Sequence, residues 1–188
     1  MLLDLDRYDI TELLQDWNRG DLQARNALFD LVYAPLRRTA QQVPRPGRTV
    51  SVSALVHEAF LRLSGSESAQ FHDRTHFAAT CVRVLRFLAI DQYRRAQVRE
   101  DHAAKQPPAS LAADGDSVLQ RLDLQGALAE LDGQRPEAAE AVTLRYWGGL
   151  QMEEVAAQMD CSLSKARRRV RAAEFFLRTR LYEATQEE

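Results

Sequence analysis

The sequence predicts an all-α protein made of two helical bundles that a flexible linker joins, with a helix-turn-helix in the second bundle. Apolar residues recur at spacings of three and four along most of the chain. No segment shows the sustained alternation, bounded by hairpin turns, that a strand requires. Between these patterns, proline, glycine and short polar residues replace large apolar ones. We expect a first domain at 1–99, a linker at 100–116 and a second domain at 117–188.

Four helices are expected in the first domain. Asp21 follows a glycine that ends the first helix, and its carboxylate can cap the second. Prolines and a glycine at 44–47 separate the second helix from the third, for which Ser53 is the expected cap. Thr75 can cap the fourth helix, whose apolar stripe runs to about Arg99. These four helices account for most of the large apolar residues before the linker.

Four further helices are expected after the linker. Leucines at helical spacing predict one helix at 119–131, and Pro136 at a first-turn position opens the next. A pair of glycines at 148–149 ends that second helix. A short helix at 151–159 and a longer one at 163–183 complete the domain.

The last two of these helices predict a helix-turn-helix. Ser162 can cap the second helix after a tight break, and Ala166 and Val170 would face the core and leave the cations outward. In such a motif the front of the second helix enters the major groove of DNA. A solvated amphipathic helix, kept soluble by its charges, is the alternative interpretation. The predicted duplex-binding residues are Ser164, Lys165, Arg167, Arg168, Arg169 and Arg171.

A second concentration of basic residues lies at 82–99, where arginines alternate with aromatic residues. Cations that hold a phosphate backbone, beside rings that stack on bases, are typical of single-strand binding. A long helix with an apolar stripe and a basic outer face has much the same pattern. The predicted binding residues are Arg83, Arg86, Phe87, Tyr93, Arg94 and Arg95, together with the one acid, Asp91.

Several function classes are excluded by composition and motif. No apolar run approaches the roughly 18–20 residues that span a bilayer, and the acidic N-terminus lacks the features of a signal peptide. Two distant cysteines fit a reduced, cytoplasmic protein. His72 and His76 are four residues apart but lack a third ligand, so neither a metal nor another cofactor is expected. Without a nucleophile elbow or a glycine-rich loop, enzyme activity is not expected.

Four motifs in order carry a resemblance to a known family. LVHEAFLRL at 55–63, RVLRFLAIDQYRR at 83–95, the linker and the helix-turn-helix are arranged as in the extracytoplasmic-function (ECF) sigma factors of bacterial RNA polymerase. The resemblance extends over about residues 9–183. It implies a protein that binds the polymerase core, through the β′ clamp and the β flap, and directs it to promoters.

The same resemblance implies a role for each motif. The segment 77–95 resembles the part that melts the −10 element and holds its non-template strand, and 162–171 resembles the start of the −35 recognition helix. The helix at 55–63 resembles the one that docks on the β′ clamp. Its predicted polymerase-binding residues are Leu55, Val56, Glu58, Phe60 and Arg62.

The sequence departs from the family pattern in two places. Asp160 stands where family members usually have glycine, and aspartate is among the few residues that tolerate the left-handed conformation. The segment 49–54 lacks the acidic cluster that usually contacts the clamp. We therefore expect weak polymerase binding that phosphorylation of Thr49, Ser51 or Ser53 would strengthen. The branch that the sequence resembles implies a Ser/Thr kinase as the activator.

Two other functions remain open. A stand-alone helix-turn-helix regulator would bind palindromic duplex tightly by itself, with half-sites about one helical turn apart. A helical protein-interaction module would use both basic helices only as solvated surfaces. The helix at 55–63, followed by a basic and aromatic helix, is the feature that favours a sigma factor over both.

Overall fold

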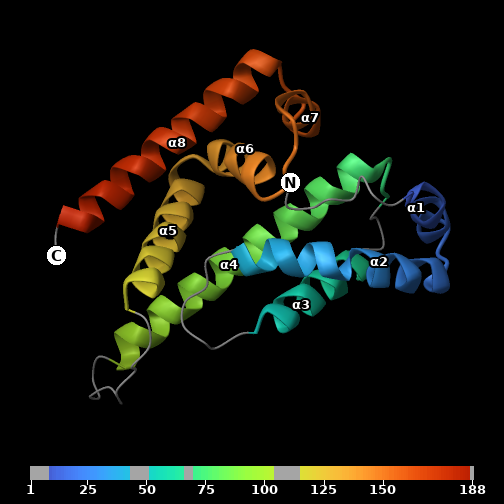
Figure 1. The fold of residues 1–188 in the computed structure, drawn as a ribbon, viewed down its shortest axis with the longest axis horizontal. Coiled ribbons are helices and arrows are strands. Elements are labelled where there is room, and N and C mark those ends of the chain that lie inside the picture. The colour runs from blue at the N-terminus through green and yellow to red at the C-terminus, as the bar shows by residue number, and fades with distance from the viewer. Residues whose placement is uncertain (1–8, 43–50, 66–69, 104–114, 187–188) are drawn as a thin grey trace.

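The computed structural model describes residues 9–42, 51–65, 70–103 and 115–186, and every regular element in these ranges is a helix (Figure 1). The all-α prediction is therefore confirmed for the described part of the chain. In order, the helices are α1 Thr11–Asn18, α2 Leu22–Gln42, α3 Val52–Ser64, α4 Arg74–Ala103, α5 Gly115–Gln134, α6 Pro136–Tyr146, α7 Met152–Gln158 and α8 Leu163–Gln186.

An aromatic cluster forms the centre of the first half, which comprises α1 to α4. The ring of Trp17 meets Phe60, Phe71 and Phe77 edge-on, with ring centroids 6.0, 5.1 and 6.1 Å away. Fully buried leucines from α2, α3 and α4 surround these rings. Such edge-to-face pairs add specificity of packing to the burial of large apolar area.

Side-chain caps fix where the helices of the first half begin. The carboxylate of Asp21 accepts hydrogen bonds from the backbone N–H groups of Gln23 and Ala24, as predicted. The other two predicted caps are wrong. Ser51, rather than Ser53, caps α3 by accepting from the N–H of Ala54.

The cap of α4 is likewise displaced from its predicted position. Asp73, rather than Thr75, accepts from the N–H of His76 at 2.7 Å. In both α3 and α4 the cap lies two residues earlier than predicted, because the helix begins before its first buried apolar residue.

The second half is built around two smaller apolar clusters. Leu131, Ala139 and Ala173 join α5, α6 and α8 in one cluster. Val155 of α7 and Ala166 of α8 lie in the other, together with Leu144 of α6. The alanines among these residues allow the helices to approach closely.

The two halves are in contact along α4. Figure 1 shows α5 and α6 on one side of this long helix, with α3 on the other. Ala79 of α4 belongs to the same apolar cluster as Ala141 and Leu144 of α6. Trp147, just after α6, packs against the cores of both halves. The apolar interior is therefore continuous from one half to the other.

The predicted linker is partly helical. Residues 100–103 belong to the end of α4, and residues 115–116 belong to the start of α5. The remainder of the predicted linker, 104–114, lies outside the described residues. Within the described ranges, no helix combines the length and apolar character needed to cross a membrane.

Candidate functional site

The turn between α7 and α8 has the geometry that the sequence predicts. Asp160 adopts a left-handed backbone conformation, with φ of 44°. The hydroxyl of Ser162 accepts from the N–H of Lys165 at 3.3 Å and so caps α8. Ala166 and Val170 are buried, also as predicted. The following turns of α8 consequently present their charged residues away from the core.

Cations occupy the exposed front of α8. Lys165, Arg168 and Arg171 are exposed to solvent, as is Ser164. Arg167 is exposed too, with a guanidinium nitrogen 3.7 Å from a carboxylate oxygen of Glu153 on α7. A protruding row of donors on one helix face can contact the phosphates and base edges of a DNA groove.

Arg169 is an exception among these cations, and its predicted outward position is wrong. The residue is buried, and its guanidinium forms an ion pair with Glu137 in the first turn of α6. It lies one turn before Ala173 and three residues after Ala166, both in the core. Arg169 therefore holds α8 against α6 and is not available to DNA in this conformation.

A basic hollow beside α8 contains an arginine that the sequence analysis missed. The hollow has a volume of about 540 Å³ and includes Arg135, Pro136, Lys165 and Arg168 in its lining. Arg135 immediately precedes the N-terminus of α6, whose N–H groups favour anions. In the sequence, the position of Arg135 directly before a proline that opens a helix is the signal that could have indicated this cation.

The exposed face of α3 differs from the predicted one. Leu55 and Val56 are fully buried, so direct contact of these two side chains with a partner is excluded in this conformation. Phe60 is half-buried and packs on Phe29, with ring centroids 4.0 Å apart. Leu61, which the sequence analysis missed, is 68% exposed.

Charged residues flank Leu61 on α3. Arg62 donates to Glu58 at 3.2 Å, and its guanidinium carbon lies 4.8 Å from the ring centroid of Phe87 on α4. Phe87 is itself 57% exposed. These residues form one continuous surface of α3 and α4, which we call the α3 face and define as Glu58, Leu61, Arg62 and Phe87.

The predicted phosphorylation sites lie at or before the start of α3. Thr49 is outside the described residues. Ser51 is exposed and caps the helix. Ser53 is half-buried, and its hydroxyl lies 3.3 Å from the hydroxyl of Tyr33. Of the two described serines, Ser51 is therefore the more accessible.

Two predicted strand-binding arginines of α4 are engaged by the second half. Arg83 donates through Nε to Glu140 of α6 at 2.6 Å, and through a terminal nitrogen to the carbonyl of Gln158 of α7 at 2.7 Å. Arg86 donates to Asp132 of α5 at 2.6 Å. Both ion pairs are largely withdrawn from solvent.

The remaining predicted residues of α4 have mixed surroundings. Tyr93 is half-buried beside Gly126 of α5. Arg94 is more exposed, with a guanidinium nitrogen 3.8 Å from Asp132. Arg95 and Asp91 form an ion pair within the helix, at 2.9 Å.

Within the described ranges, no three histidine, cysteine or acidic side chains cluster in a way that could hold a metal ion. The rings of His72 and His76 stack, with centroids 5.0 Å apart. Burial, followed by the nearby His72 and Arg83, lowers the pKa of His76, and Asp73 opposes this shift. Cys81 is a fully buried free thiol whose pKa is raised by burial.

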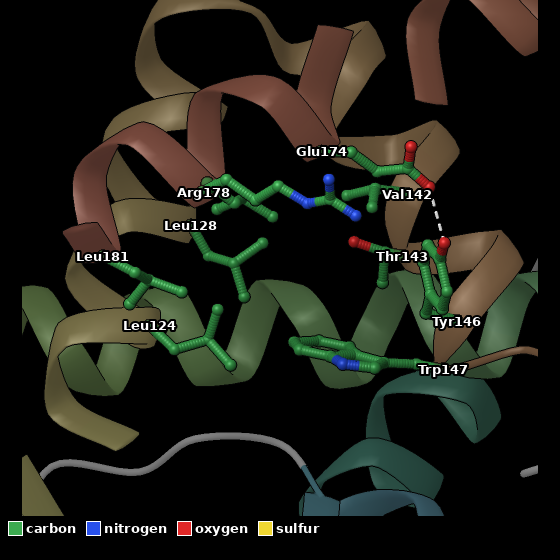
Figure 2. A pocket seen from close by; sticks show the side chains of 10 residues that line it. Leu124, Leu128, Val142, Thr143, Tyr146, Trp147, Glu174, Arg178 and Leu181 are labelled. Atoms are coloured by element: carbon green, nitrogen blue, oxygen red, sulfur yellow. Dashed lines mark hydrogen bonds between the residues drawn. The ribbon is translucent and has the colours of Figure 1, made fainter. Parts of the chain in front are cut away.

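An apolar pocket opens between α5, α6 and α8 (Figure 2). It has a volume of about 310 Å³, and leucines from α5 and α8 form much of its lining. At one end Tyr146 donates to Glu174 at 2.5 Å, and this hydrogen bond is the main reason why the pKa of Tyr146 is raised. Trp147 forms the wall nearest to α4 in Figure 2.

Comparison with known proteins places the chain in a family. No curated protein matches the sequence. A family model described as "ECF sigma factor" matches residues 7–184, which is nearly the whole chain and includes α1 to α7 and most of α8. This extent agrees with the order of motifs in the sequence and with the all-helical structure. The chain therefore belongs to the ECF sigma factors, which are regulators of transcription initiation.

Proposed function

We propose that this protein binds the core of RNA polymerase in the cytoplasm and directs it to promoters, using α3 for the polymerase, α4 for the opened strand and α8 for the −35 duplex. The observation that carries the proposal is the exposed row of cations on α8, directly after a tight turn. The family to which the chain belongs is one of alternative sigma factors.

The α7–α8 pair supports duplex binding as a helix-turn-helix. The left-handed turn at Asp160 and the cap at Ser162 set the angle at which α8 leaves the motif. Lys165, Arg168 and Arg171 then project from its front. Arg135 adds a cation beside the same surface, suited to the DNA backbone.

Two surfaces, one of mixed character and one apolar, support binding to the polymerase. The α3 face combines an exposed leucine with an arginine and a glutamate, a composition suited to the β′ clamp. We assign the pocket between α5, α6 and α8 to an apolar helix of the β flap. Leucines line that pocket, and the exposed Phe175 and Tyr182 on α8 add aromatic surface to the second half.

Phosphorylation at the start of α3 is proposed as the switch that strengthens the clamp contact. The segment 49–54 contains no acid, so the complement to a basic partner is missing. A phosphate adds about −1.5 to −2 charges, and at a helix N-terminus it is favoured by the helix dipole. Ser51 is the exposed cap of α3, and Ser53 lies one residue inside the helix.

Run-off transcription with purified core polymerase tests this function. The wild-type protein would be compared with Thr49→Glu, Ser51→Glu and Ser53→Glu forms in core binding and in transcript yield. Transcripts that depend on the protein support the sigma assignment, and a gain in core binding by a Glu form supports the switch. If the unmodified wild type by itself binds core polymerase and is fully active, the sigma assignment stands and the phosphorylation switch is discarded.

The rival function predicts a different result in the same experiment. A stand-alone regulator would not associate with core polymerase in any form. It would bind palindromic duplex by itself, with half-sites about one turn apart. Two control variants, Arg19→Glu and Asp16→Asn, alter exposed charges at the end of α1 that belong to none of the proposed binding surfaces, and they should leave transcription unchanged.

A further inference from the structure

The strand-binding face predicted for α4 is covered by the second half of the same chain. The arginines Arg83 and Arg86 point to acids on α5 and α6, and Tyr93 faces α5. These are residues that would otherwise meet phosphates and bases. The cover therefore lies over the surface that the proposed function requires to be open.

The contacts to the two arginines resemble those that a phosphate backbone would make. Carboxylate oxygens of Glu140 and Asp132 lie 2.6 Å from the guanidinium nitrogens of Arg83 and Arg86. Charge-assisted hydrogen bonds of this length are among the stronger polar contacts in proteins. An arginine that bonds a carboxylate in this way cannot bond a DNA phosphate with the same nitrogens.

Uncharged contacts seal the same interface. Gln125 of α5 is buried and donates to the backbone carbonyl of Ala89 at 2.6 Å. One residue later, a Cβ added at Gly126 would lie only 2.7 Å from the hydroxyl oxygen of Tyr93. The absence of a side chain at Gly126 thus leaves room for the Tyr93 hydroxyl against α5.

We propose that α5 and α6 act as an intramolecular cover on α4, in which Asp132 and Glu140 occupy the arginines that the opened DNA strand must take. The inference rests on the proposed function, because it assigns the covered face to single-stranded DNA. The free protein is then mostly closed, and strand binding requires the halves to separate. DNA and the second half compete for one surface.

The competition has a quantitative consequence. If only one molecule in ten is open, the apparent dissociation constant for a single strand is raised about tenfold over that of the open form. Because both competitors are anionic, each neutralises the same arginines. A substitution that opens the interface without altering its charge should therefore recover about tenfold in affinity.

Gly126→Leu in the full-length chain is the variant that tests the cover. A leucine forces either Tyr93 or α5 to move, and scattering shows which of them does; leucine is also a better helix former than glycine. The matched control is Gly133→Leu on the same helix, where the described residues place no atom within 4 Å of an added Cβ. Binding of a fluorescent oligothymidine, small-angle X-ray scattering and unfolding would be measured for both.

The cover predicts three joint results. A compact chain of this length has a radius of gyration of about 16 Å, and Gly126→Leu should exceed the wild type while Gly133→Leu does not. In a Trp17→Phe background, emission from Trp147 should shift to the red on opening. The oligothymidine should bind Gly126→Leu about tenfold more tightly than the wild type or Gly133→Leu.

Gln125→Glu separates the cover from simple electrostatics. A carboxylate cannot donate to the Ala89 carbonyl and is costly to bury, so the halves should part. The substitution also adds negative charge, which by itself weakens DNA binding. Tighter binding of oligothymidine by Gln125→Glu supports the cover, and weaker binding by an open, folded Gln125→Glu overturns it.

Other outcomes overturn the inference in distinguishable ways. If the wild type already exceeds the compact radius of gyration of about 16 Å, or if a variant that scattering shows to be open binds the oligothymidine no more tightly, the cover is wrong. In both cases, transcription by the wild type with core polymerase would leave the proposed function intact. If no form binds core polymerase or supports transcription, the proposed function fails and the inference fails with it.

Discussion

The arginines of α4 and those of α8 have opposite surroundings, although both helices were predicted to bind nucleic acid. On α4, Arg83 and Arg86 are held by acids from the other half of the chain. On α8, Lys165, Arg168 and Arg171 face solvent. The difference shows that a basic helix is not by itself a free binding surface, because its neighbours decide which cations remain available.

A functional order follows from this difference. Under the proposed function, the exposed cations of α8 would meet duplex DNA without rearrangement, whereas those of α4 would become available only after separation of the halves. Duplex contact first and strand capture second is the order in which a promoter is recognised and then opened. Each of the following predictions tests one side of the comparison.

The largest effect is expected on the exposed side. Reversing two charges of α8 with Lys165→Glu and Arg168→Glu should reduce promoter-dependent transcription about 100-fold or more, since each lost contact costs about 1–3 kcal/mol and repulsion is added. Core-polymerase binding should be unchanged. Arg19→Glu, a reversal directly after α1, is the control. Equal losses in all these variants would contradict a specific role for α8.

The next effect concerns the α3 face. Leu61→Ala should weaken binding to core polymerase about tenfold, because it removes much of an exposed apolar side chain that the proposed interface would bury. The matched control is Leu22→Ala, which truncates another leucine that is 61% exposed, on α2. Binding would be measured by fluorescence anisotropy with labelled polymerase. Similar weakening by both variants would remove Leu61 from the interface.

The covered side can be measured by a double-mutant cycle. Arg86 and Asp132 are only 17% and 23% exposed, so their coupling energy, from Arg86→Ala and Asp132→Ala, should be about 1 kcal/mol in urea unfolding. The exposed pair Arg19–Asp16, treated in the same way, should couple by only a few tenths of that. Equal coupling of the two pairs would show that the contact between halves is weak in solution.

A smaller effect is expected at the turn before α8. Asp160 has a φ of 44°, a conformation that glycine adopts with less strain. Asp160→Gly should therefore stabilise the fold by about 0.5 kcal/mol and raise Tm slightly. The same substitution at Asp30, within α2, should destabilise the protein instead. A destabilised Asp160→Gly would mean that the aspartate side chain makes a contact of its own.

The smallest effect is expected from the pH dependence of stability through His76, near the start of α4. Its pKa in the folded state is lowered, so the unfolded state takes up its proton first as the pH falls. Stability is retained above the unfolded pKa of about 6.5 and is lost as the pH falls through that value toward the folded pKa. His76→Gln should lose less stability than the wild type between pH 7.5 and 5.5. The same substitution at His57 is the control.

The helices and most of their turns were predictable from the sequence because periodicity and capping chemistry are local. The cap at Ser162, the left-handed Asp160 and the buried Ala166 all follow from residues within a few positions of each other. Arg169 was not predictable in the same way. It belongs to a run of cations, and only the position of Glu137 on another helix makes it a buried partner.

The same limit explains the differences on α3 and α4. Leu55 and Val56 match the family motif for polymerase binding, yet the motif does not tell which of its residues face inward. Leu61 is a large apolar residue of that helix that is exposed instead. The pairing of Arg86 with Asp132 spans 46 positions, so nothing near either residue indicates it. Long-range packing decides these cases.

The position of Trp147 between the two halves affects how the molecule folds and whether the chain can be divided into fragments. The indole packs on both cores, and Ala79 of α4 lies in a cluster otherwise formed by α6, α7 and α8. Cutting the chain between α4 and α5 would leave each fragment with apolar surface that its counterpart normally shields. We expect each fragment to be less stable alone than within the intact chain, and the two fragments to associate when mixed, because each shields apolar surface of the other.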